Sequence, residues 1–238
     1  MEDMEKESKN YQNNHPEDRL IRSFGRIKSR KLSDHKNYLL ENLLPLYQVS
    51  SSDSSVSKNF SKTALEIGFG FGDFLFEKAK NNPDIFFIGS EPHLNGVLNL
   101  LAKLEKEPLP NLKISQTDVR ILLADFPEEF FDEIFILFPD PWPKLKHFKR
   151  RLINSEFLDF LSKKIKSKPV GKLTIATDHD SYKTWILSAI SENKSFKWLA
   201  ESKKDWQIFP DWWTITKYQK KAAAEDRVSV IFNLIKNV

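Results

Sequence analysis

Short apolar runs recur along the chain, and the segments between them carry apolar residues at helical spacing. Runs of this length that are rich in β-branched and aromatic residues are typical of buried strands. The expected strands are residues 63–67, 85–89, 112–116, 133–138 and 172–176, and a last run, 227–235, alternates as an added strand. Strands that alternate with helices predict βαβ units, and therefore an α/β fold with a mostly parallel sheet and helices on both faces. Ligands of such sheets bind at the carboxyl ends of the strands.

The first 57 residues differ in composition from the rest. Residues 1–18 are polar and are expected to form a tail, and residues 19–47 suit an arm with a short helix. Residues 50–57 are nearly all Ser and Asp, the composition of a flexible connector. We therefore divide the chain into an appendage, 1–57, and a folded domain, 58–238.

Positive charge is concentrated in two segments, although the formal net charge is only +4. Such clusters suit a polyanionic partner, but solvated charged faces have the same composition. The first cluster lies in the arm and comprises Arg19, Arg22, Arg26, Lys28, Arg30, Lys31 and Lys36. The second comprises Lys144, Lys146, Lys149, Arg150 and Arg151.

The composition narrows the class of protein further. No run approaches the roughly 20 apolar residues of a membrane-spanning helix, and the first residues lack the layout of a secretory signal, so we expect a cytoplasmic protein. The chain has no cysteine and only five scattered histidines, which makes a metal site an unfavoured interpretation.

Three glycines, Gly68, Gly70 and Gly72, directly follow the first expected strand, which ends in Glu66-Ile67. Glycine permits positive φ and lets a ligand approach the backbone closely. A dinucleotide fingerprint, G-x-G-x-x-G, would need its third glycine at position 73, where this chain has Asp73. The loop is either a binding loop for another cofactor or an ordinary turn.

Acidic residues follow the next three expected strands as well. Glu91 comes after the second, Asp118 after the third, and Asp140 after the fourth. Each alone suits a plain loop residue, but strand ends of a parallel sheet meet at one edge, where these acids would surround one ligand. Prolines on both sides of Asp140 stiffen its loop, and a rigid turn before a helix is the alternative interpretation.

These motifs resemble those of known enzymes. The glycine loop is similar to the first motif of class I methyltransferases, in which it surrounds the methionine part of S-adenosylmethionine, a cation that suits a carboxylate such as Glu66. The segment Phe138-Pro139-Asp140-Pro141-Trp142-Pro143-Lys144, followed by His147 and Lys149-Arg150-Arg151, resembles the signature of bacterial tRNA (guanine-N7)-methyltransferases. That family methylates the variable-loop guanine at position 46 of tRNA. The similarity covers most of the chain, from the arm near Arg22 to Thr216-Lys217-Tyr218.

The resemblance implies a Rossmann-like class I methyltransferase fold with a seven-stranded sheet, S-adenosylmethionine as cofactor and tRNA as substrate. The implied cofactor contacts are Glu66, Gly68, Gly70, Glu91, Asp118 and Asp140, the last also being the catalytic residue. The implied substrate contacts are Lys144, Asp178, Thr216, Lys217, Tyr218 and Gln219. The family usually has Glu where this chain has Gln219, a residue that keeps the hydrogen-bonding capacity but lacks the negative charge.

Guanine N7 carries a lone pair and no proton, so methyl transfer to it needs no general base. Carboxylates such as Asp140 and Asp178 would accept hydrogen bonds from guanine N1–H and N2–H₂ and stabilise the cationic product. Asp178 also suits a cap of a helix beginning near Ser181. The aromatic residues Trp142, Tyr182, Trp212 and Trp213 suit either base stacking or the core.

Two other functions remain open on the sequence. One is an enzyme of the same fold that acts on another RNA, a protein or a small molecule. The other is a non-catalytic RNA-binding module with a relic cofactor pocket. The oligomeric state and the set of modified tRNAs are not encoded in any motif.

Overall fold

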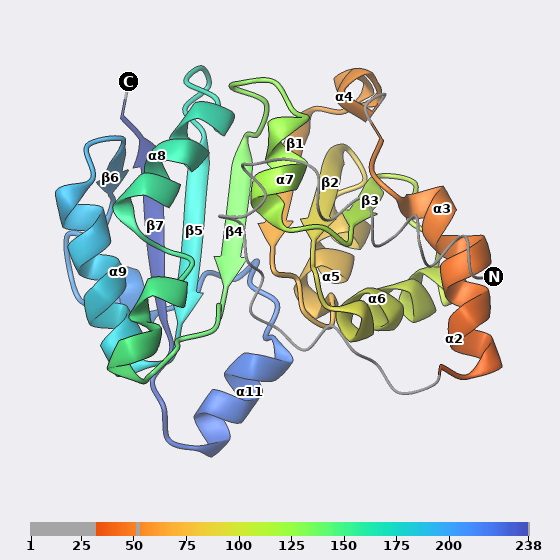
Figure 1. Cartoon of the computed structure of the whole chain (residues 1–238). Helices are drawn as coiled ribbons and strands as arrows, with labels where there is room; N and C mark the ends of the chain where they lie inside the picture. The colour runs from red at the N-terminus through yellow and green to blue at the C-terminus, as the bar shows by residue number, and fades with distance from the viewer. Residues whose placement is uncertain (1–31, 51–52, 238) are drawn as a thin grey trace.

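A seven-stranded sheet forms the centre of the molecule in the computed structural model, which describes residues 32–50 and 53–237 (Figure 1). The strand order is β3-β2-β1-β4-β5-β7-β6; β7 pairs antiparallel with β5 and with β6, and all other neighbouring strands pair in parallel. The predicted fold class is thereby confirmed. The strands are β1 (Lys62–Ile67), β2 (Ile85–Ser90), β3 (Leu112–Ser115), β4 (Glu133–Leu137), β5 (Lys172–Thr177), β6 (Phe196–Trp198) and β7 (Val230–Lys236).

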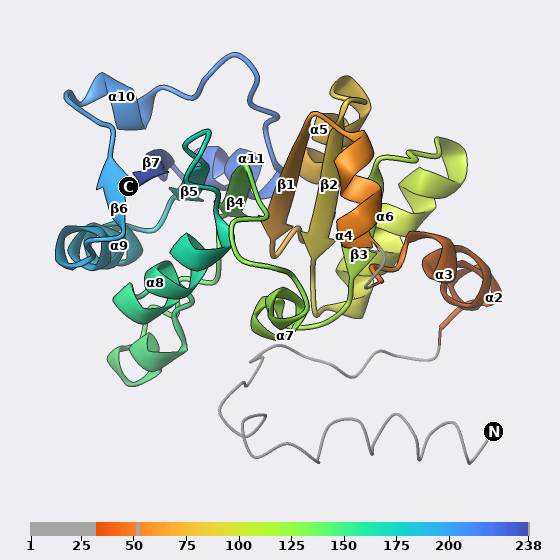
Figure 2. The ribbon, with the colours of Figure 1, turned by 90° about the horizontal axis from the view of Figure 1, so that it is seen from above.

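Helices cover both faces of this sheet. The face with α7, α8 and α9 lies opposite the face with α5 and α6, and Figure 2 shows α7 and α8 on one side and α5 on the other. The helices of these layers are α5 (Asp73–Asn81), α6 (Leu94–Lys106), α7 (Val119–Ala124), α8 (Ser155–Lys164) and α9 (Asp180–Glu192). Other helices in this part of the chain are η4 (Leu145–Arg150), α10 (Lys204–Gln207) and α11 (Lys217–Ala224).

Strand periodicity divides the apolar residues between two cores. In β1, Leu65 belongs to the core under α7, α8 and α9, whereas its neighbour Ala64 belongs to the core under α5 and α6. Successive strand side chains point to opposite faces, so a strand buried on both sides reads as a continuous apolar run. Glu66 interrupts that run in a strand that is otherwise apolar after Thr63, and its side chain is buried.

The segment before the sheet differs in part from its prediction. Residues of the expected arm form α2 (Asp34–Tyr38), η2 (Leu39–Leu43) and α3 (Leu44–Tyr47), and Leu39 and Tyr47 are buried in the core under α5 and α6. The expected connector is wrong for its second half, which forms α4 (Asp53–Val56) and begins η3 (Ser57–Asn59). Asp53 is buried and accepts a hydrogen bond from the backbone N–H of Ser50 at 2.7 Å. Residues 1–31, with most of the basic arm, lie outside the described residues.

One strand was not predicted, and the start of another was misplaced. Strand β6 has only three residues, too few for a recognisable pattern, and it was not predicted. The last strand begins at Val230 instead of 227, because Val230 pairs with Thr177, the last residue of its partner β5. Within the described residues, no helix is long and apolar enough to cross a membrane.

Candidate active site

A cavity of about 320 Å³ opens at the carboxyl ends of the parallel strands. It receives residues that follow β1, β2, β3 and β4, as expected for a ligand site in this type of sheet. Five of the six expected cofactor contacts line it: Gly68, Gly70, Glu91, Asp118 and Asp140. Trp142, Arg150 and Tyr218 are among the other residues that line it.

The glycine loop is held by Glu91. One carboxylate oxygen of Glu91 accepts a hydrogen bond from the backbone N–H of Gly70, and the other accepts one from that of His93, both at 2.8 Å. Gly68, Gly70 and Gly72 all have positive φ, the conformation that glycine permits and that was expected for this loop. A Cβ at Gly96 on α6 would lie 2.4 Å from the carbonyl oxygen of Gly70, so α6 can approach the loop this closely only with glycine at position 96.

Glu66 is buried. It lines a second, much smaller cavity together with Phe71, Thr216 and Tyr218. Its Oε2 atom has no hydrogen-bond partner among the described residues. Burial, and to a smaller extent the carboxylates of Glu91 and Asp73, raise the pKa of Glu66 to about 8 despite the opposing charge of Lys103. A cationic ligand beside this carboxyl group would favour its ionised form and lower its pKa.

Lys103, on α6, contacts both the glycine loop and the start of α5. Its ammonium group forms an ion pair with Asp73 and donates a hydrogen bond to the carbonyl oxygen of Phe71 at 3.2 Å. This lysine was not singled out in the sequence, because nothing in the pattern of α6 distinguishes it from other surface lysines.

Asp118 has a local partner in addition to its place in the cavity wall. It caps α7 by accepting a hydrogen bond from the backbone N–H of Arg120, and it forms two hydrogen bonds with the guanidinium group of the same residue. Burial raises the pKa of Asp118, but the bonds from Arg120 outweigh that effect and the pKa is lowered. The carboxylate is therefore preorganised as a hydrogen-bond acceptor at the cavity.

Arg151 holds the loop that contains Asp140 through a hydrogen bond to its backbone. The buried guanidinium of Arg151 donates to the carbonyl oxygen of Pro141 at 2.8 Å and to the carbonyl and hydroxyl oxygens of Ser181. It also stacks 3.6 Å from the ring centroid of Phe148. Asp140 itself lines the cavity and is exposed to solvent. The loop thus places Asp140 in the lining of the cavity, with prolines on both sides of it.

The second basic cluster is therefore not a uniform surface patch, and its interpretation was wrong for Arg151, which is buried and holds the loop. Lys144, Lys146 and Lys149 are exposed on or beside η4. The guanidinium of Arg150 lies 4.9 Å from the ring centroid of Trp142, at the wall of the cavity.

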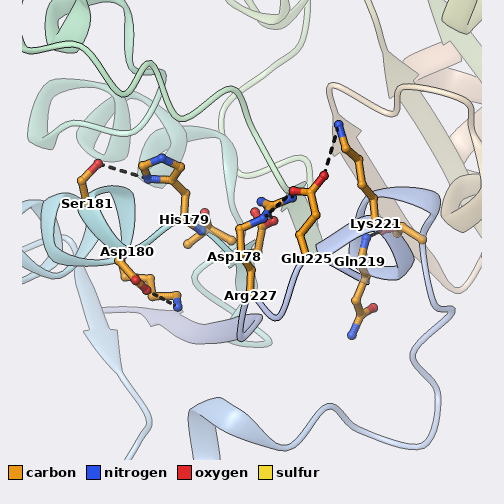
Figure 3. A network of polar contacts seen from close by, with 11 residues as sticks. Asp178, His179, Asp180, Ser181, Gln219, Lys221, Glu225 and Arg227 are labelled. Carbon is orange, nitrogen blue, oxygen red and sulfur yellow. Dashed lines mark hydrogen bonds and ion pairs between the residues drawn. The ribbon is translucent and has the colours of Figure 1, made fainter. Parts of the chain in front are cut away.

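Asp178, at the end of β5, lies outside this cavity and belongs to a polar network (Figure 3). Its carboxylate forms an ion pair with Arg227, which also binds Glu225 at 2.8 Å, and Lys221 lies 3.9 Å from Glu225. The alternative interpretation of Asp178 as a helix cap is wrong, because the N-cap of α9 is His179 and no side chain caps that helix.

The start of α11 lies over the glycine loop. Thr216 caps the helix by accepting a hydrogen bond from the backbone N–H of Gln219, and the ammonium group of Lys217 lies 4.3 Å from the ring centroid of Phe71. A Cβ on Gly70 would lie 3.1 Å from the ring of Tyr218. Tyr218 therefore contacts the cofactor side of the site as well as the expected substrate side.

Gln219 accepts a hydrogen bond from the indole N–H of Trp213 at 2.7 Å. The carbonyl oxygen of a Gln side chain is sufficient for this contact, so the absence of the family's usual negative charge leaves the bond intact. Among the aromatic residues considered for base stacking, Tyr182 is fully buried and Trp213 is partly buried against the core, whereas Trp142 lines the cavity and Trp212 is exposed.

Comparisons with known proteins agree with this geometry. A family model described as "Putative methyltransferase" matches residues 61–231. The chain is 36% identical over 220 residues to the tRNA (guanine-N(7)-)-methyltransferase of Chelativorans sp. (strain BNC1), which covers 90% of this chain and 94% of that protein. It is 41% identical over 204 residues to the protein of the same name from Wolbachia pipientis wMel, with 82% and 88% covered.

Solved structures are similar in fold at lower identity. The 16S rRNA methyltransferase KamB matches with a TM-score of 0.60 and 15% identity over 80% of this chain and 95% of that chain. A mutant 16S rRNA (adenine(1408)-N(1))-methyltransferase with cosubstrate SAM from Catenulisporales acidiphilia matches with a TM-score of 0.53 and 13% identity over 80% and 93%.

Proposed function

The chain belongs to the tRNA (guanine-N(7)-)-methyltransferase family, and we propose that it transfers a methyl group from S-adenosylmethionine to N7 of the variable-loop guanine, position 46, in tRNA. The observation that carries this proposal is the convergence of the glycine loop, Glu91, Asp118 and Asp140 on one cavity. Residues 58–238 are proposed to form the methyltransferase domain, and the basic arm before it to contact tRNA phosphates.

The residues present fit S-adenosylmethionine. Glu66 offers a buried carboxyl oxygen without a partner among the described residues, and a cationic ligand would supply the missing interaction. Gly68 has open space around the position of a Cβ, so the loop backbone is accessible to a ligand. Asp118 supplies an acceptor at the adenosine end, and Glu91 keeps the loop in its binding conformation.

When bound, S-adenosylmethionine would supply an electrophilic methyl group that guanine N7, which has a lone pair and no proton, can accept, with S-adenosylhomocysteine as the leaving group. The protein therefore orients the base and stabilises the positive charge that develops on it. Asp140 is proposed to do this at the cavity mouth, with its loop held by Arg151. Asp178 is proposed to accept hydrogen bonds from the guanine edge, while Lys144 and its exposed neighbours contact phosphates.

The test is to incubate the protein with methyl-labelled S-adenosylmethionine and an unmodified tRNA transcript, then to identify the labelled nucleoside and its position. We expect N7-methylguanosine at position 46 and no label in a transcript that carries adenosine there. An RNA of unrelated structure and a mixed protein substrate serve as controls. Label in protein or in another nucleoside would contradict the proposed substrate, and calorimetric binding of NAD without binding of S-adenosylmethionine would contradict the proposed reaction.

A further inference from the structure

The network in Figure 3 joins two parts of the molecule that are remote in sequence. Asp178 follows β5, whereas Arg227 lies 49 residues later, between α11 and β7. The side chain of Asp178 is 13% exposed and that of Arg227 is 33% exposed, so the ion pair is largely shielded from solvent. Shielding makes the pair stronger than an ion pair on the open surface.

Backbone geometry directs Arg227 to this partner. The backbone N–H of Arg227 donates to the carbonyl oxygen of Ala222 at 2.9 Å, which closes the end of α11. Asp226 has a φ of 54°, an uncommon conformation for a residue other than glycine, and it reverses the chain just before Arg227. Glu225 then binds the guanidinium group through two nitrogen atoms, at 3.1 and 2.8 Å. The guanidinium group is therefore oriented by Glu225, a residue close to it in sequence, as well as by Asp178.

Arg227 occupies only one oxygen of Asp178. The ion pair is formed with Oδ2, and Oδ1 has no hydrogen-bond partner among the described residues. A carboxylate that is fixed through one oxygen presents the other in a defined direction, which is the arrangement needed to accept a hydrogen bond from a ligand N–H. The register of the sheet sets Ala176 opposite Leu137, so Asp178 leaves the sheet beside the loop that leads to Asp140.

On the basis of the proposed function, we propose that Arg227 is a positioning residue for substrate specificity, which orients Asp178 so that its free oxygen accepts a hydrogen bond from the 2-amino group of the target guanine. Arg227 itself need not touch the base. Its loss would leave Asp178 in place but free to rotate, and the protein would then discriminate poorly between guanine and a purine without the 2-amino group.

The experiment compares tRNA transcripts that carry guanosine or inosine at the methylated position. Inosine keeps N7 and N1–H and lacks only the 2-amino group. The variants are Arg227→Met, Arg227→Lys and Asp178→Asn, and the matched control is Lys221→Met, which removes the outer ion pair with Glu225 and leaves Arg227 on Asp178. For each protein, kcat and KM are measured with both transcripts, together with the unfolding temperature and the dissociation constant of S-adenosylhomocysteine.

We expect the unaltered protein to prefer guanosine by at least about tenfold in kcat/KM, and the Lys221→Met protein to keep that preference. In Arg227→Met and Asp178→Asn the preference should fall below about threefold, because activity on guanosine falls while activity on inosine changes little. Arg227→Lys keeps the charge without the fixed fork of donors, so its preference should be intermediate.

Several results would overturn the inference. The inference is wrong if the unaltered protein does not prefer guanosine over inosine, or if Arg227→Met keeps the preference unchanged. It is also wrong if Arg227→Met loses activity equally on both transcripts, because that result would indicate a structural role only. A loss of S-adenosylhomocysteine binding larger than the loss of preference would place the effect at α11 instead of Asp178. If Arg227→Met does not fold, an unchanged preference in Arg227→Lys refutes the inference. Failure of the unaltered protein to methylate guanosine in tRNA would refute the proposed function instead.

Discussion

Replacement of Glu66 by Gln should change the pH dependence of stability. In the folded protein the pKa of Glu66 is raised to about 8 from its ordinary value of 4.5, chiefly by burial. Between these two values the folded protein holds a proton that the unfolded chain has lost. Its stabilising effect is complete below pH 4.5 and decreases as the pH rises towards 8. Gln has nearly the same shape and does not titrate, so this contribution should be absent in Glu66→Gln.

The expected size follows from the pKa. Each pH unit within this window costs up to about 1.4 kcal/mol, so raising the pH from about 5 to about 7.5 should destabilise the original protein relative to Glu66→Gln by about 3 kcal/mol. For a protein of this size, about 3 kcal/mol corresponds to roughly 6–12 °C in unfolding temperature.

The assay is thermal unfolding of both proteins across that pH range, with and without saturating S-adenosylhomocysteine. Without ligand, the gap between the two unfolding temperatures should move in favour of Glu66→Gln as the pH rises. With ligand the movement should be smaller, because the cationic amino group of the ligand favours the ionised carboxylate. Parallel pH profiles for the two proteins would refute the assignment of a buried, protonated Glu66.

Three further predictions concern the loop and the arm. Asp140→Asn should lower turnover on tRNA at least about tenfold with an almost unchanged unfolding temperature, and near-normal turnover of the folded variant would remove Asp140 from the catalytic residues. Arg151→Met should lower both stability, by about 1–3 kcal/mol, and turnover, because it leaves the carbonyl oxygens of Pro141 and Ser181 without their donor; a thermal melt like that of the original protein would contradict this. Deletion of residues 1–31 should weaken tRNA binding and reduce the log–log salt slope by roughly 0.7–0.9 for each lost phosphate contact, and an unchanged slope would show that the arm does not contact RNA.

The fold was largely accessible from the sequence, because strands buried on both faces leave long apolar runs and the glycine loop marks the first strand end. The local sequence pattern does not predict an element that is short or that is stabilised by contacts with residues distant in sequence. Strand β6 is recognisable only through its pairing with β7. Helix α4 begins at Asp53, whose carboxylate accepts a hydrogen bond from the backbone N–H of Ser50, in a segment whose composition suggests a flexible connector.

The same limit applies to the site. Residue type and strand order located Glu91, Asp118 and Asp140 at one edge, and the cavity there contains all three. Charge alone did not distinguish Arg151, which is buried against aromatic rings, from the exposed lysines beside it. Asp178 was considered as a helix cap because the following residues suit a helix start, whereas its partner, Arg227, is 49 positions away and could not be inferred from spacing.

The place of β7 in the sheet has a consequence for synthesis of the protein on the ribosome. Val230–Lys236 inserts between β5 and β6, both of which are made earlier in the chain. Until this segment has been translated, one edge of β5 has no partner strand, and unpaired edges invite association with other chains. The nascent protein should therefore depend on chaperones late in translation, and messages cut short before codon 230 should yield aggregated protein.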